Sequence, residues 1–487
     1  MTTFRSVSLP VIAAGSVCGA FYFYLSRVSH YYGAASLADV ALVYGGAGVV
    51  TALLVVWLHF SGSRFAAAGD YRSGMLWVLA FALVFRLLGV LTFPVLEDDF
   101  YRYLWDGRMF VHSGSPYGIA PADFFASTDL SERFETILDG INYPGVATVY
   151  GPTLQLAFGL GYLISPGAVW PLQCLFGLAD VLVLLILLKF VRPDSRPSLL
   201  CWLLYAWSPL LIKEFATTAH PDILGALFVL LAFLLHQKPG PDASTDNWPR
   251  LLLLGFLLAL AVGVKPFALV IAPFLIGLRL QAMTGFALGI LLVTLPFTGV
   301  ALVTDSASAL GVWLPEGLQT MGQDWFFNAG LYELAYWLGV HDLVLLKRIA
   351  LGAFAVIWLL IWGRTMAADR AQRSQASVPV ASFAASLARS IVVLFGLFLL
   401  VVPALNPWYL AWWLPFAVIR PCITPWVASF AVLLSYLSGI NVSSGTALDS
   451  FGALYTLPGW VLAIEFGSIG LALIVDLRLI FSAKTAD

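Results

Sequence analysis

Long apolar runs alternate with short polar segments along the whole chain. A run of about 20 apolar residues is long enough for an α-helix to cross the hydrocarbon core of a bilayer. The runs are continuous and lack the residue-by-residue alternation of outer-membrane strands. The pattern therefore predicts membrane-spanning helices at residues 8–27, 37–58, 74–95, 169–190, 197–213, 222–236, 251–264, 266–279, 283–301, 349–366, 390–404, 408–419, 424–440 and 456–476.

The composition agrees with this pattern, because 60% of the 487 residues are hydrophobic and only 11% are charged. A soluble domain carries about 25% charged residues. We therefore predict an all-α polytopic membrane protein with about 12–14 transmembrane helices. The apolar run at residues 150–166 is interrupted by glycines and prolines, and we interpret it as a re-entrant or interfacial helix outside that count.

The basic residues predict the orientation of the chain. Most of the 25 lysines and arginines fall on one side of the membrane when the N-terminus is placed in the cytoplasm, as the positive-inside rule requires. We therefore predict a plasma (inner) membrane protein whose long loop at residues 96–150 lies on the external, periplasmic face. This loop holds nine of the 27 acidic residues, namely Glu97, Asp98, Asp99, Asp106, Asp123, Asp129, Glu132, Glu135 and Asp139.

The second half of this loop has a helical pattern. Asp129 and Glu132 have the spacing of a capping box. Acidic residues lie between apolar ones, which predicts an amphipathic helix on the outer membrane surface. The apolar positions at helical spacing are Leu130, Phe134, Ile137, Leu138 and Ile141.

The loop begins with an unusual concentration of charge, from Glu97 to Arg108. Close carboxylates repel one another, and the raised pKa that results suits a general base. Asp99, Arg102 and Asp106 lie near one face of a helix, at positions i, i+3 and i+7. A solvated helix end is the ordinary alternative, but the two arginines and the additional acid favour a functional site.

Two isolated cations interrupt apolar runs. Lys265 stands in Val264-Lys265-Pro266, and an ammonium at membrane depth is costly and usually functional. Its natural partner is an anion such as a phosphate, while the alternative is a lysine whose head reaches the membrane surface. Arg86 poses the same question within the run at residues 74–95.

Two further segments combine polar and aromatic residues at the ends of apolar runs. His220-Pro221-Asp222 opens a predicted helix, where proline and aspartate are ordinary. A His-Asp pair facing the loop acids would also suit sugar hydroxyls, phosphate or a metal. Asn406-Pro407-Trp408-Tyr409 is either part of an interfacial aromatic belt or a platform that stacks a sugar or shapes a lipid groove.

Taken together, these segments resemble the GT-C superfamily of polyprenyl-phosphate-sugar-dependent glycosyltransferases, and its bacterial mannosyltransferase-like members in particular. They follow the expected order along the chain. Gly151 stands where a second proline is expected, and Ser115 where asparagine is common. The matching segments are Asp99-Phe100-Tyr101-Arg102-Tyr103-Leu104-Trp105-Asp106-Gly107-Arg108, Ser115-Pro116-Tyr117 with Pro121, Ile141-Asn142-Tyr143-Pro144 with Thr148-Val149-Tyr150-Gly151-Pro152, Lys213-Glu214 with His220-Pro221-Asp222, Val264-Lys265-Pro266, and Asn406-Pro407-Trp408-Tyr409.

The resemblance implies a helix bundle whose external loop carries a catalytic acid. It implies inverting transfer of a hexose, with mannose favoured, from a polyprenyl-phosphate donor to a hydroxyl of an envelope glycolipid or glycan on the outer face. Asp99 is the implied general base, with Asp98 as the next candidate. The implied donor-phosphate contacts are Lys265, Arg102, Arg108 and His220. The implied sugar or acceptor contacts are Asp106, Tyr117, Tyr150, Asp222, Trp408 and Tyr409.

We expect a single integral membrane domain with three parts. These are an N-terminal helix pair (1–73), a catalytic module (74–300) and C-terminal helices (301–487). The expected partners are a polyprenyl-phosphate-linked sugar donor, a lipid- or glycan-linked acceptor and membrane lipids, with no nucleic acid. The pattern requires no cofactor, although Glu97, Asp98 and Asp99 are also compatible with a Mg²⁺ or Mn²⁺ site.

Two other classes of protein stay open on the sequence alone. A secondary transporter or lipid-linked sugar flippase would explain the helix break at Lys265-Pro266, but we find no repeat partner for that break. A non-catalytic scaffold subunit would leave the acidic and basic residues without a role.

Overall fold

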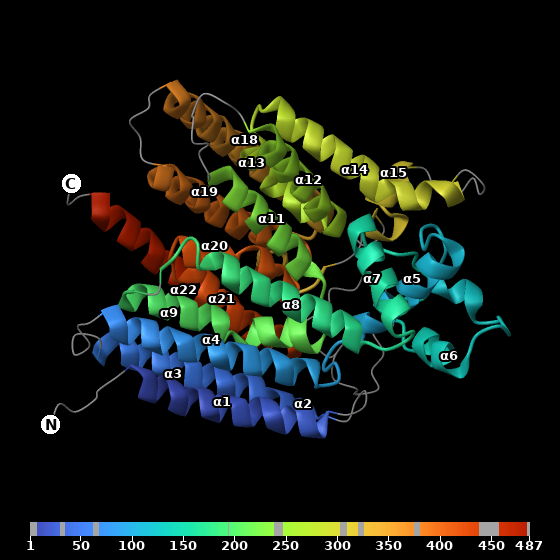
Figure 1. The fold of residues 1–487 in the computed structure, drawn as a ribbon, viewed down its shortest axis with the longest axis horizontal. Coiled ribbons are helices and arrows are strands. Elements are labelled where there is room, and N and C mark those ends of the chain that lie inside the picture. The colour runs from blue at the N-terminus through green and yellow to red at the C-terminus, as the bar shows by residue number, and fades with distance from the viewer. Residues whose placement is uncertain are drawn as a thin grey trace.

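The computed structural model describes residues 7–29, 35–61, 68–192, 194–237, 247–301, 309–319, 326–374, 380–437 and 457–484. These residues form helices and turns, with one isolated parallel bridge between Phe327 and Ala404. The all-helical prediction is therefore confirmed for the described part of the chain. The helices pack into a bundle, with α1 (Ser8–Val28) along one edge (Figure 1).

The N-terminal helices pack side by side along one edge of the bundle (Figure 1). Close contact is possible because Gly15 faces the ring of Phe81, where a Cβ would lie 2.4 Å from a ring carbon. The elements are α1 (Ser8–Val28), α2 (Leu37–Val40), the π-helical turn Ala41–Gly45, α3 (Gly46–Ser61) and α4 (Ala68–Val90).

The long loop after α4 forms a compact layer at one end of the bundle (Figure 1). The predicted amphipathic helix is present as α6, but it begins after Ser131, so the expected Asp129–Glu132 capping box is wrong. Its apolar side chains Phe134, Ile137 and Leu138 are buried within the protein. The elements are α5 (Asp99–Ser113), the 3-10 turn Pro121–Phe124, α6 (Glu132–Asp139) and α7 (Pro152–Ile164).

The central helices are interrupted at Lys265-Pro266, as the sequence predicts, and again near Pro273. The span expected at 266–279 is not one helix, because Pro266 and Pro273 divide it into two short turns, as prolines do. The elements are α8 (Trp170–Leu187), α9 (Arg196–Ala206), α10 (Pro209–Leu211), the π-helical segment η4 (Ile212–Thr217), α11 (Asp222–Gln237), α12 (Trp248–Val264), the 3-10 turn Pro266–Val270, α13 (Ala272–Ile276) and α14 (Leu280–Ala301).

The C-terminal helices complete the bundle. The span expected at 408–419 is also divided, into the 3-10 turn η6 and the short helix α20. The predicted boundaries at residues 440 and 456 lie outside the described residues. The elements are α15 (Ala309–Trp313), α17 (Gly330–Trp337), α18 (Leu343–Ser374), α19 (Val380–Val401), η6 (Pro407–Trp412), α20 (Leu414–Ile419), α21 (Thr424–Ala431), the 3-10 turn Val432–Leu437 and α22 (Gly459–Lys484).

Helix length and hydropathy identify a multi-pass membrane protein. Among the described residues, eight helices are long and apolar enough to cross a bilayer, and five shorter apolar helices of 10–17 residues accompany them. α7 is one of the shorter helices, and its 13 residues extend about 20 Å at 1.5 Å per residue. This is less than the roughly 30 Å thickness of the hydrocarbon core.

Arg86 has a structural partner deep in the bundle. Its Nη2 lies 2.6 Å from Oδ2 of Asp180 on α8, and both side chains are buried. Tyr205 donates to the other oxygen of Asp180, and Arg86 also donates to the carbonyl of Ala206. The cation in this apolar run is therefore paired and hydrogen-bonded within the protein, as a charge buried there requires.

Candidate active site

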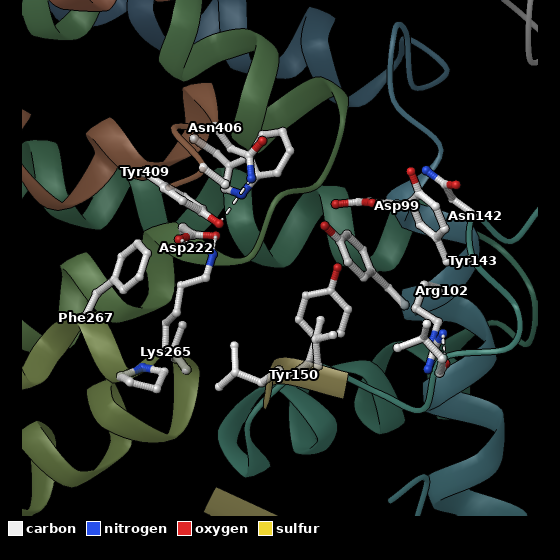
Figure 2. Close-up of a pocket in the computed structure, with 18 of the residues that line it drawn as sticks. Asp99, Arg102, Asn142, Tyr143, Tyr150, Asp222, Lys265, Phe267, Asn406 and Tyr409 are labelled. Atoms are coloured by element: carbon white, nitrogen blue, oxygen red, sulfur yellow. Dashed lines mark hydrogen bonds and ion pairs between the residues drawn. The ribbon is translucent and has the colours of Figure 1, made fainter. Parts of the chain in front are cut away.

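A cavity of about 240 Å³ opens where the long loop meets the central and C-terminal helices. Such a volume is far larger than the roughly 10–15 Å³ that one water requires. Asp99 and Arg102 line it from one side, and Asp222, Lys265 and Tyr409 from the other (Figure 2). The cavity therefore joins segments that are more than 300 residues apart in the sequence.

The acidic wall comes from the start of α5. Asp98 is the N-cap residue of that helix and Asp99 its first residue, where the helix dipole favours negative charge. The Asp99 side chain is 30% exposed. Burial, and then the charge of Asp99, raise the pKa of Asp98 to about 7, while a hydrogen bond with Asn142 opposes this shift.

Lys265 and Asp222 form an ion pair on the opposite wall. The ammonium Nζ lies 3.0 Å from Oδ1 and 3.2 Å from Oδ2 of Asp222, and Trp412 donates to the same carboxylate at 2.9 Å. The ammonium also lies 4.1 Å from the ring centre of Tyr409. Burial lowers the pKa of Lys265, but the charge and hydrogen bond of Asp222 together with other nearby groups offset this, and the net shift is upward. Lys265 is therefore charged at neutral pH.

Arg102 lines the cavity, and two hydrogen bonds hold its guanidinium in place. Its Nε donates to Asp106 at 2.9 Å, and its Nη1 donates to the carbonyl of Val146 at 2.9 Å. Asp106 is buried, accepts hydrogen bonds from Thr148 and Gln155, and does not line the cavity. The expected role of Asp106 as a sugar contact is corrected by this placement, because the residue instead anchors the guanidinium.

Two other expected contacts also lie away from the cavity lining. The guanidinium carbon of Arg108 lies 5.6 Å from the ring centre of Trp105 and 5.4 Å from that of Phe134. Tyr117 is buried and donates from its hydroxyl to the carbonyl of Tyr150 at 3.2 Å. The placement of Arg108 and Tyr117 therefore corrects their expected contacts with phosphate and sugar, and both pack the loop against its neighbours.

Aromatic residues cover much of the remaining cavity wall. Tyr150, Trp408 and Tyr409 line it. Tyr150 packs edge-on against Tyr103, with ring centres 5.2 Å apart. Asn406 donates to the Tyr409 hydroxyl at 3.1 Å (Figure 2).

His220 lies behind this wall, fully buried and outside the cavity lining. Its ring stacks on Trp408, with ring centres 3.8 Å apart and planes 13° apart. Its Nε2 lies 3.6 Å from Oδ2 of Asp99, and its Nδ1 lies 2.9 Å from Oε2 of Glu214. The expected phosphate contact by His220 is therefore corrected to a contact with the Asp99 carboxylate.

A buried charged network, which the sequence analysis did not anticipate, supports His220. Lys213 Nζ lies 3.3 Å from Glu214 Oε1 and 3.6 Å from Glu97 Oε1. The Tyr436 hydroxyl donates to Glu214 at 2.8 Å. Burial raises the pKa of Glu97 to about 7, although Lys213 and His220 oppose this shift. The Lys213-Glu214 dipeptide was the available signal, because two charges within an apolar run require partners.

The three adjacent acids have separate partners. Glu97 faces Lys213, Asp98 bonds to Asn142, and Asp99 faces His220. Within the described ranges, no group of three or more histidine, cysteine, aspartate or glutamate residues is arranged to hold a metal ion.

The glycine at position 151 has a packing cause, which leads to a first prediction. Its φ of −72° suits any residue, but a Cβ would lie 2.3 Å from the carbonyl oxygen of Gly263 on α12. We expect Gly151→Ala to push α7 away from α12 and displace Lys265, two residues beyond Gly263. A displacement of about 1 Å is expected to lower turnover on the order of 10²-fold.

Gly145→Ala is the matched control for this substitution. Position 145 lies in the same loop, and an added Cβ there has no neighbour within 4 Å. Turnover and thermal stability of the two purified variants would be compared with those of the wild type. Equal activity of Gly151→Ala and Gly145→Ala would contradict the packing argument.

A comparison with known protein families gives one match. The family model described as "Alpha-(1->6)-mannopyranosyltransferase, N-terminal domain" matches residues 7–281, more than half of the chain. The matched range includes Asp99, Arg102, His220, Asp222 and Lys265, whereas the aromatic wall at residues 406–409 lies beyond it. No curated protein and no solved structure matches the chain.

Proposed function

The chain belongs to the alpha-(1->6)-mannopyranosyltransferase family and is therefore a membrane mannosyltransferase. We propose the following reaction for its cavity. The donor is a mannose linked to a polyprenyl phosphate. The acceptor is a hydroxyl of an envelope glycolipid or glycan. The reaction takes place in the cavity between Asp99 and Lys265 on the external face of the plasma membrane. The observation that carries this proposal is a carboxylate and two cations around one cavity.

Asp99 is the general base in this proposal. As the acceptor oxygen attacks the anomeric carbon, its proton passes to the Asp99 carboxylate, and the bond from that carbon to the phosphate oxygen breaks. Direct attack in one step inverts the anomeric centre. A positioned base of this kind contributes about 10²–10⁴-fold to a rate. Asp98 is the second candidate, because its carboxyl group is already hydrogen-bonded to Asn142.

Lys265 and Arg102 bind the donor phosphate and offset the charge that develops as it leaves. Both line the cavity, and both are held by buried carboxylates that fix their positions before a substrate arrives. Donors fixed in advance around a developing anion are among the strongest catalytic contributions of proteins. The guanidinium supports a two-point contact to phosphate oxygens, and the ammonium supplies a point charge.

The aromatic wall supports the sugar contacts. Tyr150, Trp408 and Tyr409 line the cavity, and aromatic rings with the two tyrosine hydroxyls suit the apolar face and the hydroxyls of a hexose. Two of these three residues come from the C-terminal half of the chain, beyond the family match. A flippase would need no general base and is not the activity of this family.

The external location of the cavity gives a second prediction, on topology. Thr128 is exposed in the long loop, and Ala368 is exposed near the end of α18. In a background with Cys174 replaced by serine, we expect Thr128→Cys in intact cells to react with a membrane-impermeant maleimide. Ala368→Cys should react only after the cells are opened. The reverse labelling pattern would contradict the external placement of the reaction.

A further inference from the structure

His220 is buried between the base of the proposed reaction and a charged network. Asp99 and Tyr103 of α5 face it, as do Glu97 before that helix, Glu214 and Thr218 from the η4 region, and Trp408 from η6. Lys213 and Tyr436 lie one layer further, on Glu214. Asp98 is the chain neighbour of Asp99. Three carboxylates therefore surround one imidazole ring, and two of them, Glu214 and Glu97, also contact the Lys213 ammonium.

The contacts of the two ring nitrogens orient the imidazole. Nδ1 lies 2.9 Å from Glu214 Oε2 and 2.9 Å from Thr218 Oγ1. Nε2 is buried, has no hydrogen-bond partner among the described residues, and points to Asp99 Oδ2 at 3.6 Å. Trp408 covers the ring face. Nδ1 is therefore held by Glu214 and Thr218, and Nε2 faces the carboxylate of Asp99. These contacts and the stacking on Trp408 restrict rotation of the ring.

The backbone before His220 is held in an uncommon conformation. Ala219 has φ +58°, in the left-handed region that non-glycine residues rarely adopt. The His220 N–H donates to the Glu214 carbonyl at 2.7 Å, directly after the π-helical segment η4. π-Helical segments and left-handed residues of this kind cluster at functional sites. The chain therefore adopts an unfavourable turn at the one place that aims His220 at Asp99.

We infer that His220, held by Glu214, is a positioning residue that keeps Asp99 ionised and selects it over Asp98 as the base. The inference rests on the proposed function. The imidazolium retains its own proton throughout, and the acceptor proton ends on Asp99. A cation beside Asp99 favours its charged form, while Asp98 has an amide partner and no comparable cation.

The electrostatic environment agrees with a charged ring. Burial lowers the pKa of His220, but contacts with Asp99 and Glu214 and the charge of Glu97 raise it to about 9. The ring is thus an imidazolium at neutral pH. Removing its charge disfavours the carboxylate form of Asp99, so the acidic limb of the pH–rate profile moves to higher pH. Activity then recovers when the pH is raised, because the Asp99 carboxyl group loses its proton even without a neighbouring imidazolium.

The test compares His220→Gln with the wild type in reconstituted membranes. Glutamine retains a side-chain donor but has no charge. We expect the acidic limb of the pH–rate profile to be displaced upward by about one pH unit, which lowers turnover up to about tenfold on the acidic side of the limb. We also expect turnover to approach that of the wild type above the limb, with an unchanged KM for the lipid donor. His112→Gln is the matched control, because His112 is an exposed histidine near the end of α5, the helix that begins with Asp99, and it contacts Tyr162.

Two comparisons separate this inference from the proposed function. If Asp99→Asn is inactive while His220→Gln has wild-type turnover and an unmoved acidic limb, the role of His220 is wrong and the proposed base stands. If Asp99→Asn stays active, the proposed function fails first. If His220→Gln does not fold, Glu214→Gln carries the test. It removes the carboxylate that stabilises the imidazolium, so the same upward displacement is expected, and an unmoved limb overturns the inference.

Discussion

Replacing Asp99 with asparagine is expected to lower mannose transfer about 10²–10⁴-fold, the usual contribution of a positioned general base. Asparagine has nearly the same shape but cannot accept the proton of the acceptor hydroxyl. The side chain is partly exposed at the cavity and its nearest charged partner is His220, so the fold is expected to be retained. The measurement is the turnover of purified protein in liposomes, with thermal unfolding as the control for folding.

Asp98→Asn is the matched variant for this prediction. It removes the neighbouring carboxyl group, which bonds to Asn142 and is partly protonated at neutral pH. We expect a loss at least about tenfold smaller than that of Asp99→Asn, because general-base catalysis is lost only with the base itself. A larger loss for Asp98→Asn would assign the base to position 98. Nearly wild-type activity of both variants would contradict catalysis by this pair.

Lys265→Met is expected to lower turnover about 10²–10³-fold, the typical effect of removing one preorganised donor from a developing anion. Methionine has a similar length and no charge. The substitution also leaves Asp222 buried without its ammonium partner, although Trp412 still donates to it. The variant is therefore expected to be less stable as well as less active.

A double variant separates these two effects. Lys265→Met with Asp222→Asn removes both charges, so thermal stability is expected to return toward that of the wild type. Turnover should remain low, because no ammonium faces the leaving phosphate. Restored turnover in the double variant would show that Lys265 acts only as a partner of Asp222. It would then have no part in binding phosphate.

Much of the helical architecture is predictable from the sequence, because a run of apolar residues has few alternatives in a membrane. The start of α5 was also predictable as a site, since its carboxylates and Arg102 share a helix face. The sequence did not predict how far along that helix face the side chains still reach the cavity. Asp106 lies seven residues after Asp99, or about 10 Å along the axis, and this rise takes it out of the cavity and into the packed layer below.

The contacts that complete the site join residues far apart in the chain. Glu97 meets Lys213, and Tyr436 meets Glu214, so no local spacing reveals the network. His220 lies close to Asp99 in space because of a turn at Ala219, which residue propensities do not predict. By contrast, the interruptions of the apolar pattern at Lys265-Pro266 and before Trp408 did predict breaks at these places, and the breaks bring Lys265 and Trp408 to the cavity.

The family match covers only some of the residues that line the cavity. The matched residues 7–281 contain the proposed base and both phosphate contacts. The wall formed by Val402, Pro403, Trp408 and Tyr409 comes from the part beyond the match. Phe327 ties this wall to the rest of the C-terminal half, since its carbonyl accepts from the Leu405 N–H at 2.8 Å. We therefore expect the matched half alone to lack a complete cavity.

The most direct test of the central claim is a transfer assay with purified full-length protein in liposomes. Polyprenyl-phosphate mannose and a nucleotide-diphosphate mannose, each labelled in the sugar, would be supplied separately with a mannosylated lipid acceptor. The account predicts label in the acceptor only from the lipid donor, with inversion at the anomeric carbon and an α-(1→6) product. Transfer from the nucleotide sugar alone, retention of the donor configuration, or passage of the intact lipid donor across the bilayer without a new glycosidic bond would contradict it.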